Sequence, residues 1–187
     1  MDANTGILVG SGEDPQGSGS RALAYQYVRT ATPQWSEISP SLGVLSLLSD
    51  VVISGSTAYA VGEQTISGVR SGVVVTSTWT SGSGFSTFVP LTGSPLFPMG
   101  TTNDSATNLA TTPILIEAEI DAANGDLWIG GMCGRVWRRT SSGVWTTFQQ
   151  TQTDTHIEGI SIPNSTNVFC GGNREGQPAQ CVVRYHP

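Results

Sequence analysis

Lysine is absent from the 187 residues, and only 12% of the chain is charged. All eight basic residues are arginine, and fourteen acidic residues give a net charge of −6. Because nucleic-acid partners are bound through basic residues that neutralise phosphates, this balance argues against such a partner. Scarce charge also disfavours helices with charged outer faces, while abundant Gly, Ser and Thr favour short strands joined by tight turns.

Long apolar runs are also lacking. No stretch of about eighteen apolar residues occurs, so the sequence predicts no membrane-spanning helix. The first twelve residues lack the basic and apolar regions of a signal peptide. We therefore expect any export signal to lie outside this chain, as in a mature chain or an excised domain.

An internal repeat is the strongest positive signal. Four apolar, strand-forming runs each stop at a glycine, at residues 7–10, 58–62, 127–130 and 168–171. Three of them follow an earlier apolar run and a polar turn, which is the pattern of a β-hairpin. A third run follows each glycine and a fourth run follows three of these, so one complete repeat holds four strands.

The repeat spacing predicts the architecture. Open four-stranded sheets with two apolar faces cannot bury both faces alone, and they solve this by stacking radially. We therefore predict an all-β, β-propeller-like fold of about four antiparallel blades in a single domain spanning residues 1–187, with a β-sandwich as the structural alternative. The predicted units are approximately residues 1–43, 44–92, 114–150 and 155–187, with an inserted loop at 93–113.

The two ends of the repeat array differ from its middle. The first unit lacks its innermost strand, and the last unit stops at its third strand, so the two ends do not sum to one four-stranded blade. The chain is then a fragment of a larger propeller, a subunit whose open strand edges pair with a companion chain or another copy, or a closed four-bladed ring.

Residues 125–130, with the sequence GDLWIG, and residues 134–137, GRVW, resemble the repeats of bacterial sensor-type propellers. Residues 139–145 and 29–35 resemble degenerate Asp-box hairpins of sialidase-like propellers, although both lack the aspartate of that motif. The resemblance implies a bacterial β-propeller, and a fold alone does not carry a function.

No catalytic constellation stands out, so the sequence favours a binder over an enzyme. A sialidase-like site would need clustered arginines and two facing carboxylates, whereas the arginines are scattered over several repeats. Glu117, Glu119 and Asp121 alternate on one strand and are expected to form a solvated face. Asp121, Asn124 and Asp126 fit a hairpin turn better than a calcium loop, and we predict no metal site and no cofactor.

Cysteine is scarce, with three in the chain. Cys170 ends the second strand of the last repeat and Cys181 starts the third, so strand pairing can bring them within disulfide reach. We predict a Cys170–Cys181 disulfide in an oxidising compartment, with Cys133 left as a buried or free thiol. The tryptophans, which fall inside strands, are expected to pack between blades.

The ligand is expected on one face of the propeller. Loops after the second and fourth strands of a meander emerge on the same face, and long loops on a rigid scaffold commonly carry binding groups. The candidate ligand-binding residues on this loop face are Glu13, Asp14, Glu63, Arg70, Asn103, Asp104, Asn173, Arg174 and Glu175.

The leading hypothesis is a secreted or cell-surface module of bacterial type that binds a protein or a carbohydrate through this loop face. Two alternatives stay open. One is a glycosidase-like or lyase propeller fragment, and the other is a subunit that completes a larger multi-chain assembly.

Overall fold

A computed structural model describes residues 5–13, 19–29, 32–43, 45–94, 115–131, 134–149, 155–174 and 180–185. These residues form fifteen strands in four antiparallel meander sheets, so the prediction of an all-β fold is confirmed. The predicted inserted loop lies almost entirely outside the described residues. Within the described ranges, no helix is long and apolar enough to cross a membrane.

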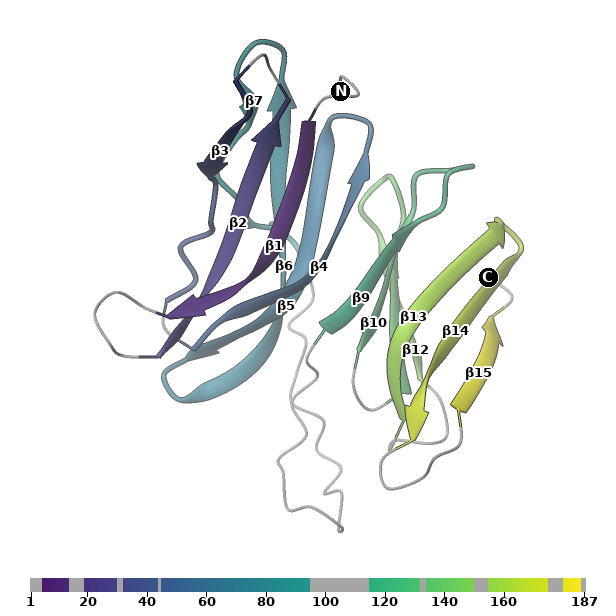
Figure 1. The fold of residues 1–187 in the computed structure, drawn as a ribbon. Coiled ribbons are helices and arrows are strands. Elements are labelled where there is room, and N and C mark those ends of the chain that lie inside the picture. The colour runs from purple at the N-terminus through teal and green to yellow at the C-terminus, as the bar shows by residue number, and fades with distance from the viewer. Residues whose placement is uncertain are drawn as a thin grey trace.

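The sheets follow one another in chain order, with sheets 1 and 2 on the left and sheets 3 and 4 on the right of Figure 1. Sheet 1 contains β1 (Thr5–Glu13), β2 (Ser20–Val28) and β3 (Gln34–Glu37), and sheet 2 contains β4 (Leu47–Ser54), β5 (Thr57–Ile66), β6 (Val69–Thr80), β7 (Gly84–Phe85) and β8 (Val89–Pro90). Sheet 3 contains β9 (Leu115–Ile120), β10 (Leu127–Gly131), β11 (Arg135–Arg139) and β12 (Trp145–Gln149), and sheet 4 contains β13 (Thr155–Asn164), β14 (Asn167–Arg174) and β15 (Gln180–Tyr185).

The three strands of sheet 1, β1, β2 and β3, correspond to the second, third and fourth strands of a complete four-stranded sheet such as sheet 3. The start of β4 lies beside the start of β2, because the Ser46 backbone N–H donates to the Ser20 carbonyl at 3.1 Å and the Ala22 N–H donates to the Ser46 hydroxyl at 3.0 Å. Since β1 is antiparallel to β2, it runs opposite to β4, as a second strand does (Figure 1). Within the described residues sheet 1 has no innermost strand, which agrees with the sequence pattern.

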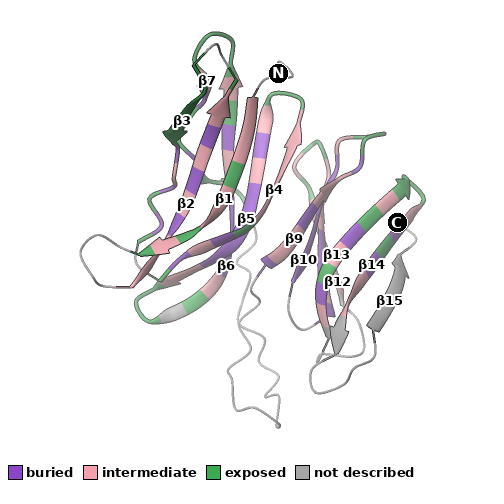
Figure 2. Ribbon diagram, viewed as in Figure 1, coloured by how far each residue is buried: buried purple, intermediate pink, exposed green. Residues whose placement is uncertain are grey.

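Three separate apolar cores lie between successive sheets. The sheet 1–2 core contains Ala22, Ala24, Ile38, Leu42, Leu48, Ala58, Ala60, Val73, Val75, Phe85 and Phe88; the sheet 2–3 core contains Val61, Val74, Leu115, Ala118, Leu127, Ile129 and Trp137; and the sheet 3–4 core contains Trp128, Val136, Ile157, Ile160, Val168 and Cys170. Adjacent residues of one strand belong to different cores, because side chains alternate across a strand. Ile129 faces sheet 2 while Trp128 faces sheet 4, so sheets 2 and 3 are buried on both faces, as Figure 2 shows for β5, β6 and β10.

The packing describes an open arc. Neighbouring sheets pack through β1 against β4, β4 against β9, and β9 against β13. Among the described residues, no comparable packing joins sheet 4 back to sheet 1. Each end sheet therefore has one face that no other sheet of the described chain packs against.

One glycine within each of β5 and β14 lies where the backbone of the preceding strand comes very close. The pairing register shifts between Leu48 and Asp50 in β4 and between Ile157 and Gly159 in β13, which is the mark of a β-bulge. A Cβ on Gly62 would lie 2.1 Å from the Leu47 carbonyl oxygen, and a Cβ on Gly172 would lie 1.6 Å from the His156 carbonyl oxygen. Gly62 of the repeat pattern, and Gly172, which follows the repeat glycine Gly171, are thus required by close backbone approach at these bulges.

Candidate functional site

Carboxylates on the innermost strands join successive sheets. Asp50 of β4 accepts a hydrogen bond from the Ala118 backbone N–H of β9 at 2.9 Å, and its other oxygen accepts from the Val51 N–H at 2.7 Å. Glu117 of β9 accepts in the same way from the backbone N–H of Ile160 in β13. Each carboxylate therefore satisfies an amide on the inner edge of the following sheet.

These two hydrogen bonds are the same arrangement repeated in successive sheets, which we call the carboxylate–amide device. Within the hairpins, Asp50 lies opposite Val61, Glu117 opposite Gly130 and Gly159 opposite Gly171, which places the three residues at the same repeat position. The last sheet has glycine there and so has no carboxylate to offer to a further sheet. Sequence reasoning missed this device, although an acidic residue in the first strand of both middle repeats was its signal.

Burial and neighbouring acidic groups raise the pKa of Glu117 and of Glu119. The pKa of Glu117 is raised from 4.5 to about 7, first by burial and then by the charges of Asp50 and Glu119, while the hydrogen bond from Ile160 lowers it. Burial and Asp50 likewise raise the pKa of Glu119. Both glutamates are half-buried and Asp121 is buried, so the prediction of a solvated face was wrong.

We expect a pH dependence of stability from Glu117. Because its pKa is higher in the folded state than in the unfolded chain, it contributes stability that is complete below pH 4.5 and is lost as the pH rises through about 7. The melting temperature should therefore be lower at pH 8 than at pH 5.

Glu117→Gln keeps an acceptor for Ile160 and should reduce this difference by roughly a few degrees. The matched variant Glu13→Gln removes one negative charge from the exposed end of β1 and should leave the difference as in the wild type. Thermal melts recorded by circular dichroism at both pH values make the comparison. An unchanged pH difference in Glu117→Gln would contradict the burial of this carboxyl group.

A groove of about 420 Å³ opens beside these carboxylates, between the β4–β5 turn and the β9–β10 turn. Its lining residues are Val52, Ile53, Ser54, Gly55, Glu119, Ile120, Asp121, Ala122 and Gly125. Its only charged lining groups are acidic, and backbone and hydroxyl groups supply the remaining polarity. A hollow with apolar walls and a few convergent polar groups is the usual form of a small binding site.

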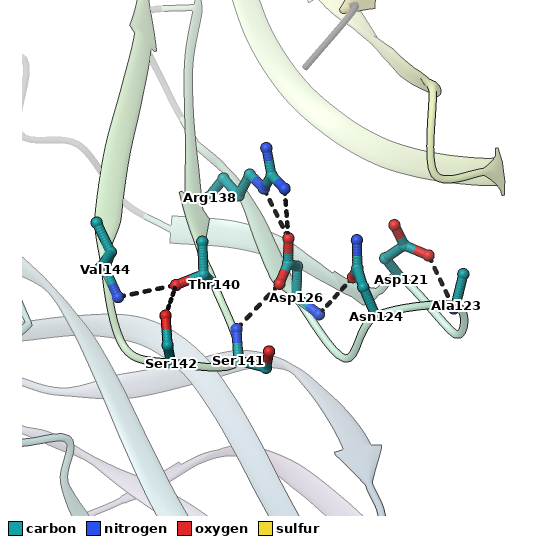
Figure 3. Close-up of polar contacts among 9 residues, drawn as sticks. All are labelled: Asp121, Ala123, Asn124, Asp126, Arg138, Thr140, Ser141, Ser142 and Val144. Atoms are coloured by element: carbon teal, nitrogen blue, oxygen red, sulfur yellow. Dashed lines mark hydrogen bonds and ion pairs between the residues drawn. The ribbon is translucent and has the colours of Figure 1, made fainter.

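The β9–β10 turn on one side of the groove is held by its own side chains (Figure 3). Asp121 accepts from the Ala123 N–H at 2.9 Å, and Asn124 accepts from the Asp126 N–H at 2.9 Å. Such Asx turns fix the backbone two residues ahead. These contacts are those of a hairpin turn, as the sequence predicts for this segment.

Asp126 anchors this turn to the next hairpin. One carboxylate oxygen accepts from Arg138 Nε at 2.8 Å and Nη2 at 2.6 Å, and the other accepts from the Ser141 N–H at 2.9 Å. The Arg138 guanidinium also lies over the Trp128 ring, 5.5 Å from its centroid. Because Asp126 is buried and both of its oxygens are occupied, it holds the turn that lines the groove and does not face a ligand.

The predicted loop-face residues are placed only in part. Glu63 and Arg70 lie in β5 and β6 and not in a loop, since that hairpin continues to a two-residue turn at Ser67 and Gly68, both with positive φ. Glu63 is buried and forms an ion pair with Arg70. Their prediction as loop residues was wrong, and their pairing is structural.

For most of the other predicted ligand residues, the structure does not describe the side chain. Glu13 is exposed at the end of β1. Asn173 and Arg174 belong to β14, but their side chains are not described. Asp14, Asn103, Asp104 and Glu175 lie outside the described residues. The groove lies at the opposite end of the sheets from this loop face, because it is formed by the turns that follow the first strands.

The structure does not contain the predicted Cys170–Cys181 disulfide. Cys170 is a free, buried thiol, and burial raises its pKa to about 12. In the sheet, Cys170 lies opposite Val183 while Cys181 lies opposite Gly172, so the two cysteines are diagonal and not directly paired. Diagonal neighbours are separated by roughly 7–8 Å, beyond the usual reach of a disulfide. Cys133 lies outside the described residues.

Comparisons with known proteins give information on the fold and on no other property of the chain. No protein-family model matches the chain, and no curated protein sequence matches it. Among solved structures, Drosophila Semaphorin 2a is similar over 100% of this chain and 42% of that chain, with a TM-score of 0.53 and 9% sequence identity. The chain thus spans less than half the length of this neighbour, and the resemblance to bacterial propellers gains no support. Because the sema domain of semaphorins is a β-propeller, the comparison and the successive sheets together show a propeller-like fold.

Proposed function

We propose that the chain is a binding module that acts outside the cell or at a cell surface and recognises a protein partner. The observation that carries the proposal is the acidic groove between two turns that are fixed to rigid sheets. Binding sites are commonly placed on loops that a rigid scaffold positions. The structural neighbour, a semaphorin, comes from an extracellular protein family, which supports the same class of function.

The chemistry of the groove favours a basic side chain as the recognised group. Glu119 and Asp121 are its only charged lining residues, and the chain as a whole has a net charge of −6. An acidic concave surface attracts cationic groups and rejects anionic ones. An arginine or lysine of a partner protein, with its aliphatic stem against Val52 and Ile120, fits these walls.

The test is a selection of random displayed peptides against the purified chain. We expect enrichment of peptides that contain arginine or lysine, and a roughly tenfold or larger loss of affinity for them in Glu119→Gln. Glu13→Gln, which removes an equal charge from the end of β1, should keep the affinity of the wild type. Selected peptides that ignore Glu119→Gln would contradict a protein ligand in this groove.

A glycan array distinguishes the second ligand class. A neutral glycan that binds the wild type and is lost in Glu119→Gln would replace the protein ligand with a carbohydrate at the same groove. Glycan binding that is lost in Glu13→Ala or Arg174→Ala would move the site to the loop face proposed from the sequence. Arg70 is unsuitable for that comparison, since its removal would leave buried Glu63 without its ion pair.

The glycosidase alternative finds less support in the geometry. Three arginines of the described residues form ion pairs in three different sheets: Arg21 with Glu37, Arg70 with Glu63 and Arg138 with Asp126. A site for a substrate carboxylate would need such groups together. The described residues do not bring these three arginines to one cleft.

A further inference from the structure

The backward face of sheet 1, which points away from sheet 2, is aromatic and open to solvent. Leu8 and Trp35 are 57% and 58% exposed on it, and Tyr25 and Tyr27 lie beside them, since Leu8 pairs with Tyr25 and Trp35 with Tyr27 across the strands. The rings of Tyr27 and Trp35 are 4.9 Å apart. Aromatic groups so placed on a sheet are typical of a surface that packs against another surface.

The fourth strands of sheets 2 and 3 carry aromatic residues at the repeat position that Trp35 occupies on this face. Trp35, Phe85 and Trp145 each open the fourth strand of their sheet, opposite the end of the third strand. Phe85 is 3% exposed in the sheet 1–2 core, and Trp145 packs against the sheet 2–3 core. Both therefore face the preceding sheet. Trp35 occupies the same repeat position in sheet 1, which is the first of the described sheets.

The second strands of sheets 2, 3 and 4 carry an aromatic residue at one repeat position on the forward face, which is the face that points to the following sheet. Tyr59, Trp128 and Phe169 lie opposite Val52, Glu119 and Ser161, at one repeat position. Tyr59 packs against the sheet 2–3 core, and Trp128 is 1% exposed in the sheet 3–4 core. Phe169 is 37% exposed, because sheet 4 is the last described sheet.

Every interface between the described sheets therefore joins a forward face to a backward face, and one face of each kind is left exposed on sheets 1 and 4. We propose that the backward face of sheet 1 in one copy docks on the forward face of sheet 4 in a second copy, so that two chains form a head-to-tail dimer. A contact between unlike faces forms a closed ring only if the rotation that relates successive copies adds up to a full turn. Two copies supply eight sheets, within the usual propeller range of about four to eight.

Light scattering coupled to size-exclusion chromatography tests the dimer. The wild type should show twice the 19.6 kDa chain mass at high concentration and dissociate on dilution. Trp35→Glu and Phe169→Glu should each raise the dissociation constant about tenfold or more. Leu8→Glu gives an independent variant of the sheet 1 face. Val144→Glu, at a 61% exposed apolar residue in the β11–β12 turn, should dimerise as the wild type does.

Mixing the two variants tests the head-to-tail geometry. A Trp35→Glu chain keeps an intact sheet 4 face and a Phe169→Glu chain keeps an intact sheet 1 face, so the mixture should regain dimer that neither variant forms alone. Absence of this rescue, with both variants folded by circular dichroism, would overturn the proposed pairing. A wild type that is monomeric at all concentrations, that forms larger assemblies, or that ignores all three end-face variants would overturn the second copy as the occupant.

Discussion

Replacing Gly172 with alanine is expected to lower the free energy of unfolding by about 3 kcal/mol or more. The added Cβ would lie 1.6 Å from the His156 carbonyl oxygen, a backbone atom at the bulge of β13 that no side-chain rotation can move aside. Overpacking in a close-packed interior typically costs about 1–3 kcal/mol even where side chains can yield, and backbone overlap costs more. The loss should appear in urea unfolding as a lower midpoint with an unchanged slope.

Gly171 is the matched control, because nothing lies within 4 Å of a Cβ built there. Gly171→Ala should change stability by less than about 1 kcal/mol, and Gly62→Ala should repeat the large loss, since its Cβ would lie 2.1 Å from the Leu47 carbonyl oxygen. Equal midpoints for Gly171→Ala and Gly172→Ala would contradict the bulge that crosses the second strand.

Removing the Asp126 carboxylate is the second change with a large expected effect. Asp126→Ala should cost about 3–5 kcal/mol, because it leaves the Arg138 guanidinium and the Ser141 amide without their acceptor in a largely buried setting. Asp126→Asn keeps one acceptor oxygen for Ser141 and should cost less. Unfolding in urea, monitored by tryptophan fluorescence, measures the series.

The exposed ion pair of Arg21 and Glu37 is the comparison for this series. Both of its side chains are more than a third exposed, and such surface pairs contribute roughly 0–1 kcal/mol. Glu37→Ala should therefore lower stability by less than about 1 kcal/mol. A loss in Asp126→Ala no larger than that in Glu37→Ala would show that the β9–β10 turn does not depend on its buried carboxylate.

The sheet pattern was predictable from the sequence because each of its signals is local. Polar turns such as residues 165–166 lie between strands, and Gly62 of the repeat pattern marks the bulge next to β5. The prediction of Glu63 and Arg70 as loop residues failed for a local reason too. The turn at Ser67 and Gly68 is only two residues long, so the β5–β6 hairpin is longer than composition suggests.

Features that depend on packing between sheets were not predictable. Strand periodicity correctly puts Glu117 and Glu119 on one face, but it does not say that β13 packs against that strand and partly buries them. The acidic residue in the first strand of each middle repeat is visible in the sequence, but the bond between Asp50 and Ala118 joins residues 68 positions apart, so the sequence does not show which amide the carboxylate binds. The disulfide prediction failed because an offset of two residues in the β14–β15 register separates partners that share one hairpin.

The central claim is that successive sheets pack face to face in chain order, with a carboxylate of one innermost strand bound to an edge amide of the next. Amide hydrogen exchange at Ala118 and Ile160 tests it most directly. The account predicts that both amides are protected in the wild type, and that Asp50→Ala removes protection at Ala118 while Ile160 stays protected. Rapid exchange at both amides in the wild type, or protection at Ala118 that survives Asp50→Ala, would contradict it.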